Sequence, residues 1–254
     1  MPAFNWNKNK GTKYRWLIYG ISGMGKTTTS KYLKGKTYLL SLDDSFHRIP
    51  FWQDKNDIWV IDPQKPMEDL NAFVESFDPS KYDNLVIDNV SNLQKLFFVE
   101  KAKETRTGLD NKMSDYNEWT TYLTRFIAYV FKWDINILVT AWEAQTKITD
   151  PSGQEFMQFG PDIRPNPRDF IMGHVDVIAR LIRNTKTGNR GCILETSIDT
   201  YAKNRLDDRK SCKVEDITSN FFFINFNHCI FKFFEFFSLK QFLIILTSFF
   251  IIWK

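Results

Sequence analysis

The stretch GISGMGKT, from Gly20 to Thr27, matches the pattern GxxxxGK[ST] at every defined position. Glycines in such a loop let backbone N–H groups turn toward phosphate oxygens, and the start of a following helix adds the positive end of its dipole. We expect Lys26 to contact the β- and γ-phosphates of a nucleotide and Thr27 to ligate Mg²⁺. The predicted nucleotide-binding residues are Gly20, Ser22, Gly23, Met24, Gly25, Lys26, Thr27 and Thr28.

The segments on either side of the loop have the patterns of a strand and a helix. Residues 14–20, YRWLIYG, are typical of a short buried strand, and residues 26–35 predict a helix that ends at Gly35. Beyond them the expected strands cover 37–44, 57–62, 82–90, 135–144, 175–184 and 191–197, and the expected helices cover 67–77, 92–104 and 115–133. This alternation predicts an α/β fold of the P-loop NTPase type, with a mostly parallel central sheet and helices on both faces.

Acidic residues follow two of the predicted strands. Asp88, in LVIDNV, is expected to hold Mg²⁺ through water, at the end of a strand lying beside the strand of the loop. The next residue is Asn89, so no glutamate activates water at that position. Asp43 and Asp44 are candidates to orient the attacking water, because phosphoryl transfer depends mainly on positioning and charge neutralisation. A turn or helix cap is the alternative for each aspartate.

Three later residues are candidates for completing the catalytic site. Thr140 ends another strand and is expected to sense the γ-phosphate, unless it is simply a buried hydroxyl at a strand end. Lys203 and Arg205 come after the last predicted strand, where they cannot easily contact the chain's own loop. They could instead contact the nucleotide of a neighbouring subunit, as an arginine finger does. On residue type alone, a solvated basic turn is favoured for this pair.

Taken in order, these motifs resemble those of phage RecA-like ATPases, often named phage nucleotide-binding proteins, a group that includes single-strand annealing proteins. The resemblance covers residues 14–210 and rests on the loop, the acids after the second strand, VIDNV, VTAWEA and AKNR. It implies a RecA-like core that hydrolyses ATP with Mg²⁺, forms homo-oligomers and acts in phage DNA recombination. It also implies that Lys203 and Arg205 act in trans. RecA has a glutamate where SLDDS has only aspartates, so the choice between Asp43 and Asp44 stays open.

The stretch 145–190 points to single-stranded DNA as a partner. DPSG, at 150–153, is a good turn and predicts a projecting hairpin. Basic side chains can follow a phosphate backbone, and exposed aromatic rings can stack on bases. The candidate DNA contacts are Lys147, Arg164, Arg168, Arg180, Arg183, Lys186, Arg190, Phe156, Phe159 and Phe170. The alternative is a solvated charged face above phenylalanines that belong to the core.

Composition excludes few functions. The net charge of +4 on 254 residues is a weak basic excess that does not by itself indicate nucleic acid. The three cysteines and three histidines lack metal-binding spacing, so no zinc site is expected. The first residues lack the apolar segment of a secretory signal, which predicts a cytoplasmic protein of the bacterial host cell.

The final residues differ in composition from the rest of the chain. Residues 221–254 contain 12 of the 24 phenylalanines, and their longest run free of charge and amide, 242–253, is shorter than the ~20 residues that span a bilayer. We expect an extension at 1–13, a RecA-like ATPase domain at 14–219 and an anomalous hydrophobic tail at 220–254. A composition of this kind is typical of a sequence translated in a shifted reading frame. Membrane contact is expected only if the tail is genuine.

Two other functions remain open from the sequence. The segment DDSFHR, at 43–48, resembles the acid that binds the phosphate acceptor in nucleoside-type kinases. Against a kinase, no arginine-rich lid is visible, and two more strands follow the strand of Thr140. A non-catalytic nucleotide switch is compatible with Asn89. Measuring ATP hydrolysis with and without single-stranded DNA separates the three functions.

Overall fold

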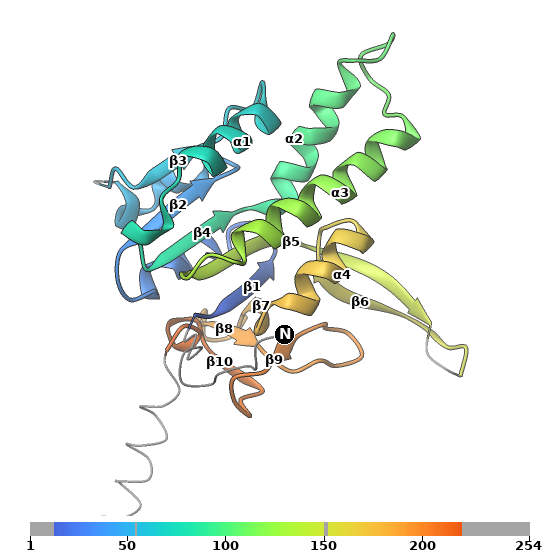
Figure 1. The fold of residues 1–254 in the computed structure, drawn as a ribbon. Coiled ribbons are helices and arrows are strands. Elements are labelled where there is room, and N and C mark those ends of the chain that lie inside the picture. Colours follow the sequence, from blue (N-terminus) through green and yellow to red (C-terminus); the bar gives the residue numbers. More distant parts are fainter. Residues whose placement is uncertain (1–12, 54, 150–151, 220–254) are drawn as a thin grey trace, which may run out of the picture. The chain divides into compact units, whose positions relative to one another are not determined.

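The computed structural model describes residues 13–53, 55–149 and 152–219. Its contacts group the chain into two units, Met1–Ile217 and Thr218–Lys254, and the fold described below is that of the first (Figure 1). The predicted tail at 220–254 and, apart from Lys13, the predicted extension at 1–13 lie outside the described residues.

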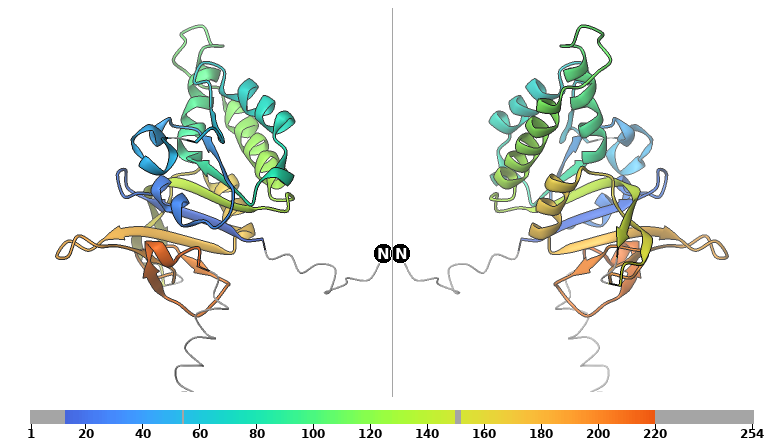
Figure 2. Two further views of the ribbon diagram at one scale, coloured as in Figure 1. Left: turned by 90° about the vertical axis from the view of Figure 1, so that its left-hand side faces the viewer. Right: turned by 90° about the vertical axis from the view of Figure 1, so that its right-hand side faces the viewer.

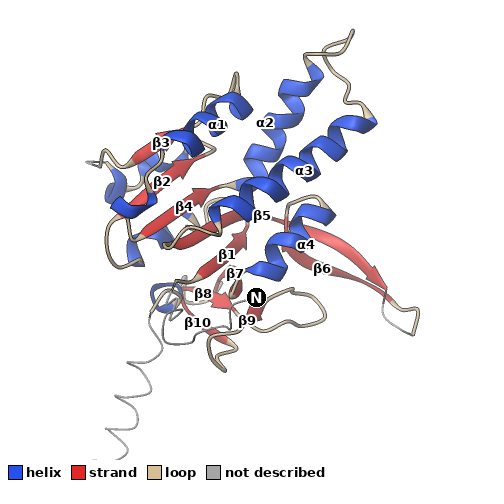
Figure 3. Cartoon of the chain, in the orientation of Figure 1, coloured by secondary structure: helices blue, strands red, loops and turns tan. Residues whose placement is uncertain are grey.

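One mixed sheet forms the centre of the first unit (Figure 3). Its described strands are β1 (Arg15–Gly20), β2 (Thr37–Ser41), β3 (Ile58–Val60), β4 (Asn84–Asp88), β5 (Asn136–Thr149), β6 (Glu155–Pro161), β7 (Val177–Arg183), β8 (Arg190–Ile193), β9 (Lys203–Asn204) and β10 (Ser211–Lys213). They follow the order β10-β8-β7-β1-β5-β4-β2-β3, with β6 paired to β5 and β9 to β7. All neighbours from β7 to β3 are parallel, and β6, β8, β9 and β10 join antiparallel.

Helices connect and cover these strands. The α-helices are α1 (Pro66–Ser76), α2 (Val90–Ala102), α3 (Met113–Val130) and α4 (Pro165–His174). Short 3₁₀ helices are η1 (Thr27–Tyr32), η2 (Ser45–Arg48), η3 (Pro50–Trp52), η4 (Pro79–Lys81) and η5 (Val214–Asp216).

Side chains of β1 alternate between two core layers, as expected for a strand buried on both sides. Leu17 and Tyr19 belong to the layer that contains apolar residues of α1, α2, α3 and α4, and the first three of these helices lie together on one face of the sheet (Figure 2). Trp16 and Ile18 belong to the opposite layer, which contains Trp52 of η3 and further residues of η2 and η5. The predicted α/β class, a mostly parallel sheet with helices on both faces, is confirmed.

Two local predictions differ from the structure. The helix predicted at 26–35 is only the six-residue 3₁₀ helix η1. Its threonines are stiff at χ1 and bond to nearby backbone, as Thr29 does to the Gly25 carbonyl at 3.1 Å, and both effects weaken an α-helix. The sequence also missed α4, because its prolines suggested a loop, although proline suits the first helical turn.

The predicted projecting hairpin is present, and its first strand is the continuation of a strand of the central sheet. β5 continues without interruption from the centre of the sheet to Thr149 and pairs with β6 from Glu143↔Pro161 to Thr149↔Glu155. The paired strands project beyond α4 (Figure 1).

Within the described parts of the chain, every helix is too short or too polar to cross a membrane.

Candidate active site

The phosphate-binding pattern forms a tight loop at the carboxyl end of the central strand β1. Gly23 and Gly25 have φ angles of 78° and 92°, in the left-handed region that favours glycine. The Lys26 ammonium lies inside the loop and donates to the carbonyl oxygens of Gly20 at 3.0 Å and Ile21 at 3.1 Å. Burial lowers the pKa of Lys26, while the nearby charges of Asp88 and Asp43 act in the opposite direction. The loop therefore surrounds a cation, as an anion-binding site requires.

The Asp88 carboxylate connects the loop to two other strands. Thr27 Oγ1 donates to Asp88 Oδ2 at 2.6 Å, and Thr140 Oγ1 donates to Asp88 Oδ1. The hydroxyl of Ser45, which the sequence did not single out, also donates to Asp88 Oδ2, at 3.3 Å. Burial, followed by the charge of Asp43, raises the pKa of Asp88 above its usual range. Three hydroxyls and one carboxylate thus converge beside Lys26.

The expected position of Asp88's strand is wrong. We predicted that this strand lies beside β1, but β5 lies between β1 and β4. Neighbouring strands are about 4.8 Å apart, so Asp88 is two strand spacings from the loop strand. Thr140, which pairs with Ile18 of β1, comes from the intervening strand and closes this gap. Asp88 still meets Thr27 because all three strands are parallel and end at the same edge.

The structure separates the two adjacent aspartates. Asp43 accepts from the Ser45 N–H at 3.1 Å and from the Asn89 side-chain amide. Asp44 is exposed, has a φ of 56°, and pairs with His47 at 2.9 Å. Only Asp43 is therefore held beside Asp88. Asn89 stands where many ATPases have a water-activating glutamate. Its side-chain amide positions Asp43 instead, a role that residue type alone did not reveal.

Lys203 and Arg205 lie away from the loop of their own chain. Lys203 pairs with Ile178 near the start of β7, and the Arg205 N–H donates to the Asp176 carbonyl at 3.0 Å. Because β7 is parallel to β1, the start of β7 lies at the end of the strands opposite the phosphate loop. Lys203 Nζ donates to the Met172 carbonyl, and burial, followed by the charge of Arg205, lowers the pKa of Lys203 to about 8. Arg205 is exposed.

The candidate DNA contacts fall into partly buried and exposed groups. Arg180 forms a partly buried ion pair with Glu143 at 2.7 Å, and its guanidinium lies 3.5 Å from the centre of the Phe159 ring. The Arg180 guanidinium and the Phe159 ring thus contact each other, and Arg180 also pairs with Glu143. That these two residues contact DNA stays a prediction. Arg164 stacks on Tyr116 at 4.4 Å. The exposed basic residues are Lys147, Arg183, Lys186 and Arg190.

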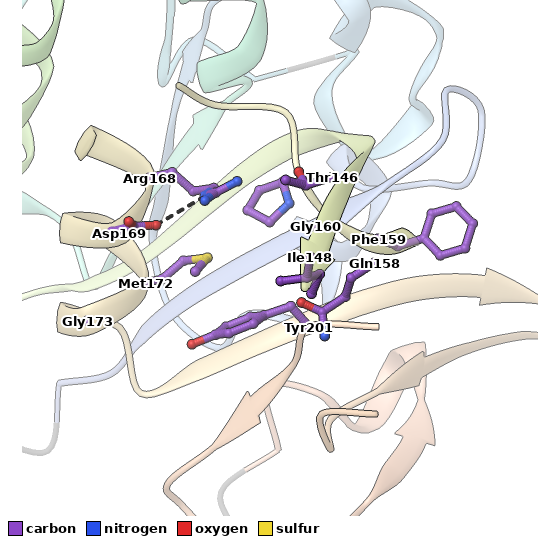
Figure 4. Close-up of a pocket in the computed structure, with 11 residues that line it drawn as sticks. Thr146, Ile148, Gln158, Phe159, Gly160, Arg168, Asp169, Met172, Gly173 and Tyr201 are labelled. Carbon is purple, nitrogen blue, oxygen red and sulfur yellow. Dashed lines mark hydrogen bonds and ion pairs between the residues drawn. The ribbon is translucent and has the colours of Figure 1, made fainter. Parts of the chain in front are cut away.

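A cavity of about 380 Å³ lies between α4 and the base of the hairpin (Figure 4). Its apolar lining includes Ile148, Met172 and Tyr201, and Arg168 on its wall pairs with Asp169 at 3.2 Å. The ring of Phe159 turns away from it (Figure 4). No residue of the phosphate loop lines this cavity, and neither do Asp43, Asp44 and Asp88, so it is separate from the nucleotide site.

The oxygen donors beside the loop suit Mg²⁺. Hydroxyl and carboxylate oxygens are hard ligands, and Mg²⁺ is usually held by one or two side chains together with water and substrate phosphates. Thr27 and Asp88 supply such donors. Among residues 13–53, 55–149 and 152–219, no cluster of three or more His, Cys, Asp or Glu residues forms a metal cage, and a magnesium site of this kind needs none.

Three comparisons with known proteins show what this chain is similar to. A family model described as "AAA domain" matches residues 12–206. Among solved structures, the RadB recombinase is similar over 78% of this chain and 84% of that chain, with 13% identity and a TM-score of 0.47. The flagellar accessory protein FlaH from Methanocaldococcus jannaschii covers 78% of this chain and 83% of its own, at 14% identity and a TM-score of 0.42. The KaiC-like protein PH0186 from Pyrococcus horikoshii covers 71% and 77%, at 12% identity and a TM-score of 0.40. Comparison with curated proteins gives no match.

Proposed function

Because this chain belongs to the AAA domain family over residues 12–206, we propose that it is a RecA-like P-loop ATPase that binds and hydrolyses Mg-ATP and acts on single-stranded DNA in phage recombination or annealing. One observation carries the nucleotide part of the proposal. Thr27 of the loop and Asp88 at the end of β4 join at 2.6 Å beside the buried Lys26. A buried cation beside hydroxyl and carboxylate oxygens supports a phosphate-binding loop with an adjoining magnesium site.

Each residue of the site has a distinct task in the proposed reaction. The loop amides and Lys26 bind the phosphates, and Thr27 and Asp88 hold Mg²⁺. Mg²⁺ bound there would neutralise negative charge on the phosphates. Thr140 fixes the orientation of Asp88 through its hydrogen bond and is in place to respond to the terminal phosphate. Asp43, held by Asn89, orients the attacking water and accepts its proton.

The DNA and oligomer parts of the proposal rest on different surfaces. The hairpin of β5 and β6 carries the partly exposed Phe156 and the exposed Met157 and Lys147, and it extends from the strand that contacts Asp88. Lys203 and Arg205 lie at the opposite edge of the sheet from the loop, which favours action on a neighbouring subunit's nucleotide over action on their own.

Single-turnover ATP hydrolysis, measured with and without a single-stranded oligonucleotide, tests the function as a whole. A DNA-dependent ATPase hydrolyses ATP faster when the oligonucleotide is added. Tight binding with no hydrolysis in either condition would indicate a nucleotide switch. Hydrolysis that responds to a nucleoside acceptor and not to DNA would indicate the kinase.

Arg205→Ala is expected to lower ATPase activity per subunit without weakening the binding of ATP to an isolated subunit. The reason is that Arg205 acts on a neighbour's nucleotide. Mixing Arg205→Ala with Lys26→Ala protein should restore part of the activity, because some interfaces then combine an intact loop with an intact Arg205. The measurement is ATPase activity across mixing ratios.

The matched control is Lys210→Ala, which removes another exposed cation from the same segment. It should leave activity unchanged in every mixture. An oligomer that contains both variants and shows no recovery would contradict action in trans.

Phe156→Ala is expected to weaken binding of a labelled single-stranded oligonucleotide while leaving the salt dependence nearly unchanged. Base stacking contributes ~1–3 kcal/mol per base and releases no counterions. Lys186→Ala should instead reduce the slope of log affinity against log salt by about 1, because a cation on phosphate displaces counterions. Titration at several salt concentrations measures both. Identical salt slopes and affinities for the two variants and wild type would exclude the β5–β6 hairpin and the turn between β7 and β8 from the DNA site.

A further inference from the structure

Arg190 lies against the phosphate loop, although the sequence placed it with the DNA contacts. It opens β8, whose antiparallel partner β7 is the neighbour of the loop strand β1. A Cβ atom built on Gly25 would collide with Nη1 of Arg190, and the guanidinium carbon would be 3.3 Å from that atom. The guanidinium therefore contacts the loop at the residue immediately before Lys26.

The charge of Arg190 is not neutralised within the described chain. Arg180, on the neighbouring strand β7, is paired with Glu143, and Arg183, also on β7, donates to the Gly188 carbonyl at 3.0 Å. For Arg190, by contrast, residues 13–53, 55–149 and 152–219 provide no ion pair or hydrogen bond to the guanidinium. A guanidinium carries five N–H donors in a planar fork that matches phosphate oxygens. Held on a phosphate-binding loop, these donors are available to an anion in that loop.

A cavity of about 470 Å³ adjoins Arg190 and the loop. Its walls include Gly25, Thr28, Tyr32 and Arg190, with the cations Lys31 and Lys213 and one acid, Glu215. Neither Asp88 nor Thr140 lines it. The cavity is within the size range of small-molecule sites and has a basic rim. It therefore extends the loop on a side distinct from the acidic magnesium site.

We propose that Arg190 is a second cationic ligand, supplied by the same chain, for the phosphates nearest the nucleoside of a bound nucleotide, and that the adjoining cavity receives the nucleoside. This inference rests on the proposed function and deepens it. Lys26 lies beside Asp88 and serves the terminal phosphates. Arg190, which lies against Gly25, serves the phosphates present in both ADP and ATP. The strand β8, which lies between β10 and β7, thereby becomes part of the nucleotide site.

Calorimetric titration of ADP and of Mg-ATP into DNA-free protein tests the proposal. Arg190→Ala is expected to weaken both nucleotides about tenfold or more, since a charged hydrogen-bonding group is lost. Arg190→Lys should recover only part of the loss, because an ammonium lacks the fork. The matched control is Arg106→Ala, which removes an exposed arginine that does not line the cavity and should bind both nucleotides like wild type. Thermal unfolding of each variant confirms that the fold is kept.

Equal nucleotide affinity for Arg190→Ala and wild type would overturn the inference and leave the proposed function intact. Loss of oligonucleotide binding with unchanged ADP affinity would also overturn it and would assign Arg190 to DNA. A weakening of ATP alone would place Arg190 at the terminal phosphate, contrary to the proposal. Failure of wild-type protein to bind either nucleotide would overturn the proposed function itself.

Discussion

Lys26→Ala is expected to reduce ATP turnover by about 10²–10³-fold, the effect of removing one preorganised donor from a site of developing negative charge. The Lys26 ammonium is buried inside the loop and lies close to Asp88 and Asp43. Without it, two carboxylates face the phosphates with no buried cation between them. Steady-state hydrolysis measures turnover, and calorimetric titration with Mg-ATP measures binding.

The control for this variant is Lys34→Ala, which removes an exposed lysine shortly after η1. Turnover in that protein should equal wild type. Lys26→Arg keeps the positive charge but changes the shape of the side chain. It shows whether turnover is lost with the charge or with a disturbed loop, because the Gly20 and Ile21 carbonyls accept from Lys26. A Lys26→Ala protein that hydrolyses ATP at the wild-type rate would exclude the loop as the phosphate site.

Asp43→Asn is expected to slow hydrolysis by about 10²-fold or more while ATP affinity stays nearly constant, because a general base contributes ~10²–10⁴-fold to rate and little to binding. Asp44→Asn should have little effect, because the Asp44 carboxylate is exposed and paired with His47. Each variant is therefore the control of the other. Single-turnover rates and dissociation constants, measured on the same samples, separate the two effects.

Asn89→Ala provides an independent check on Asp43. It removes the side-chain amide that donates to Asp43 and the oxygen that accepts from the Asn92 N–H at 2.8 Å. We expect a smaller loss of rate than for Asp43→Asn, again at constant affinity. Small, equal losses from Asp43→Asn and Asp44→Asn would show that neither is the base.

The parts of the site that the sequence predicts are local. The loop glycines, Lys26 and Thr27 occupy fixed spacings, and Asp88 ends a short apolar run that predicts a buried strand. The contact between Thr140 and Asp88 could not be predicted, because it depends on β5 lying between β1 and β4. Strand order is a property of the whole chain, and no spacing within a single segment reveals it.

The position of Arg190 was missed for a similar reason. From sequence it is one of several basic residues in a stretch rich in arginine and lysine. Its contact with Gly25 arises because β7 pairs with β1 on one side and β8 on the other, which carries residue 190 next to residue 25. Asp43 and Asp44 were equivalent in sequence for a different reason: the positive φ of Asp44 turns its side chain toward His47.

The uninterrupted course of β5 has a thermodynamic consequence. From Thr140, bonded to Asp88, to Thr149 in the hairpin, the strand spans ~30 Å at 3.3 Å per residue. The strand thus joins the predicted nucleotide site to the predicted DNA-binding hairpin by continuous backbone. If ATP shifts Thr140 and thereby changes the affinity of the hairpin for DNA by some factor, then DNA must change the affinity for ATP by the same factor, because the two binding free energies form a closed cycle. Measuring either ligand's effect on the other thus fixes the coupling energy in both directions.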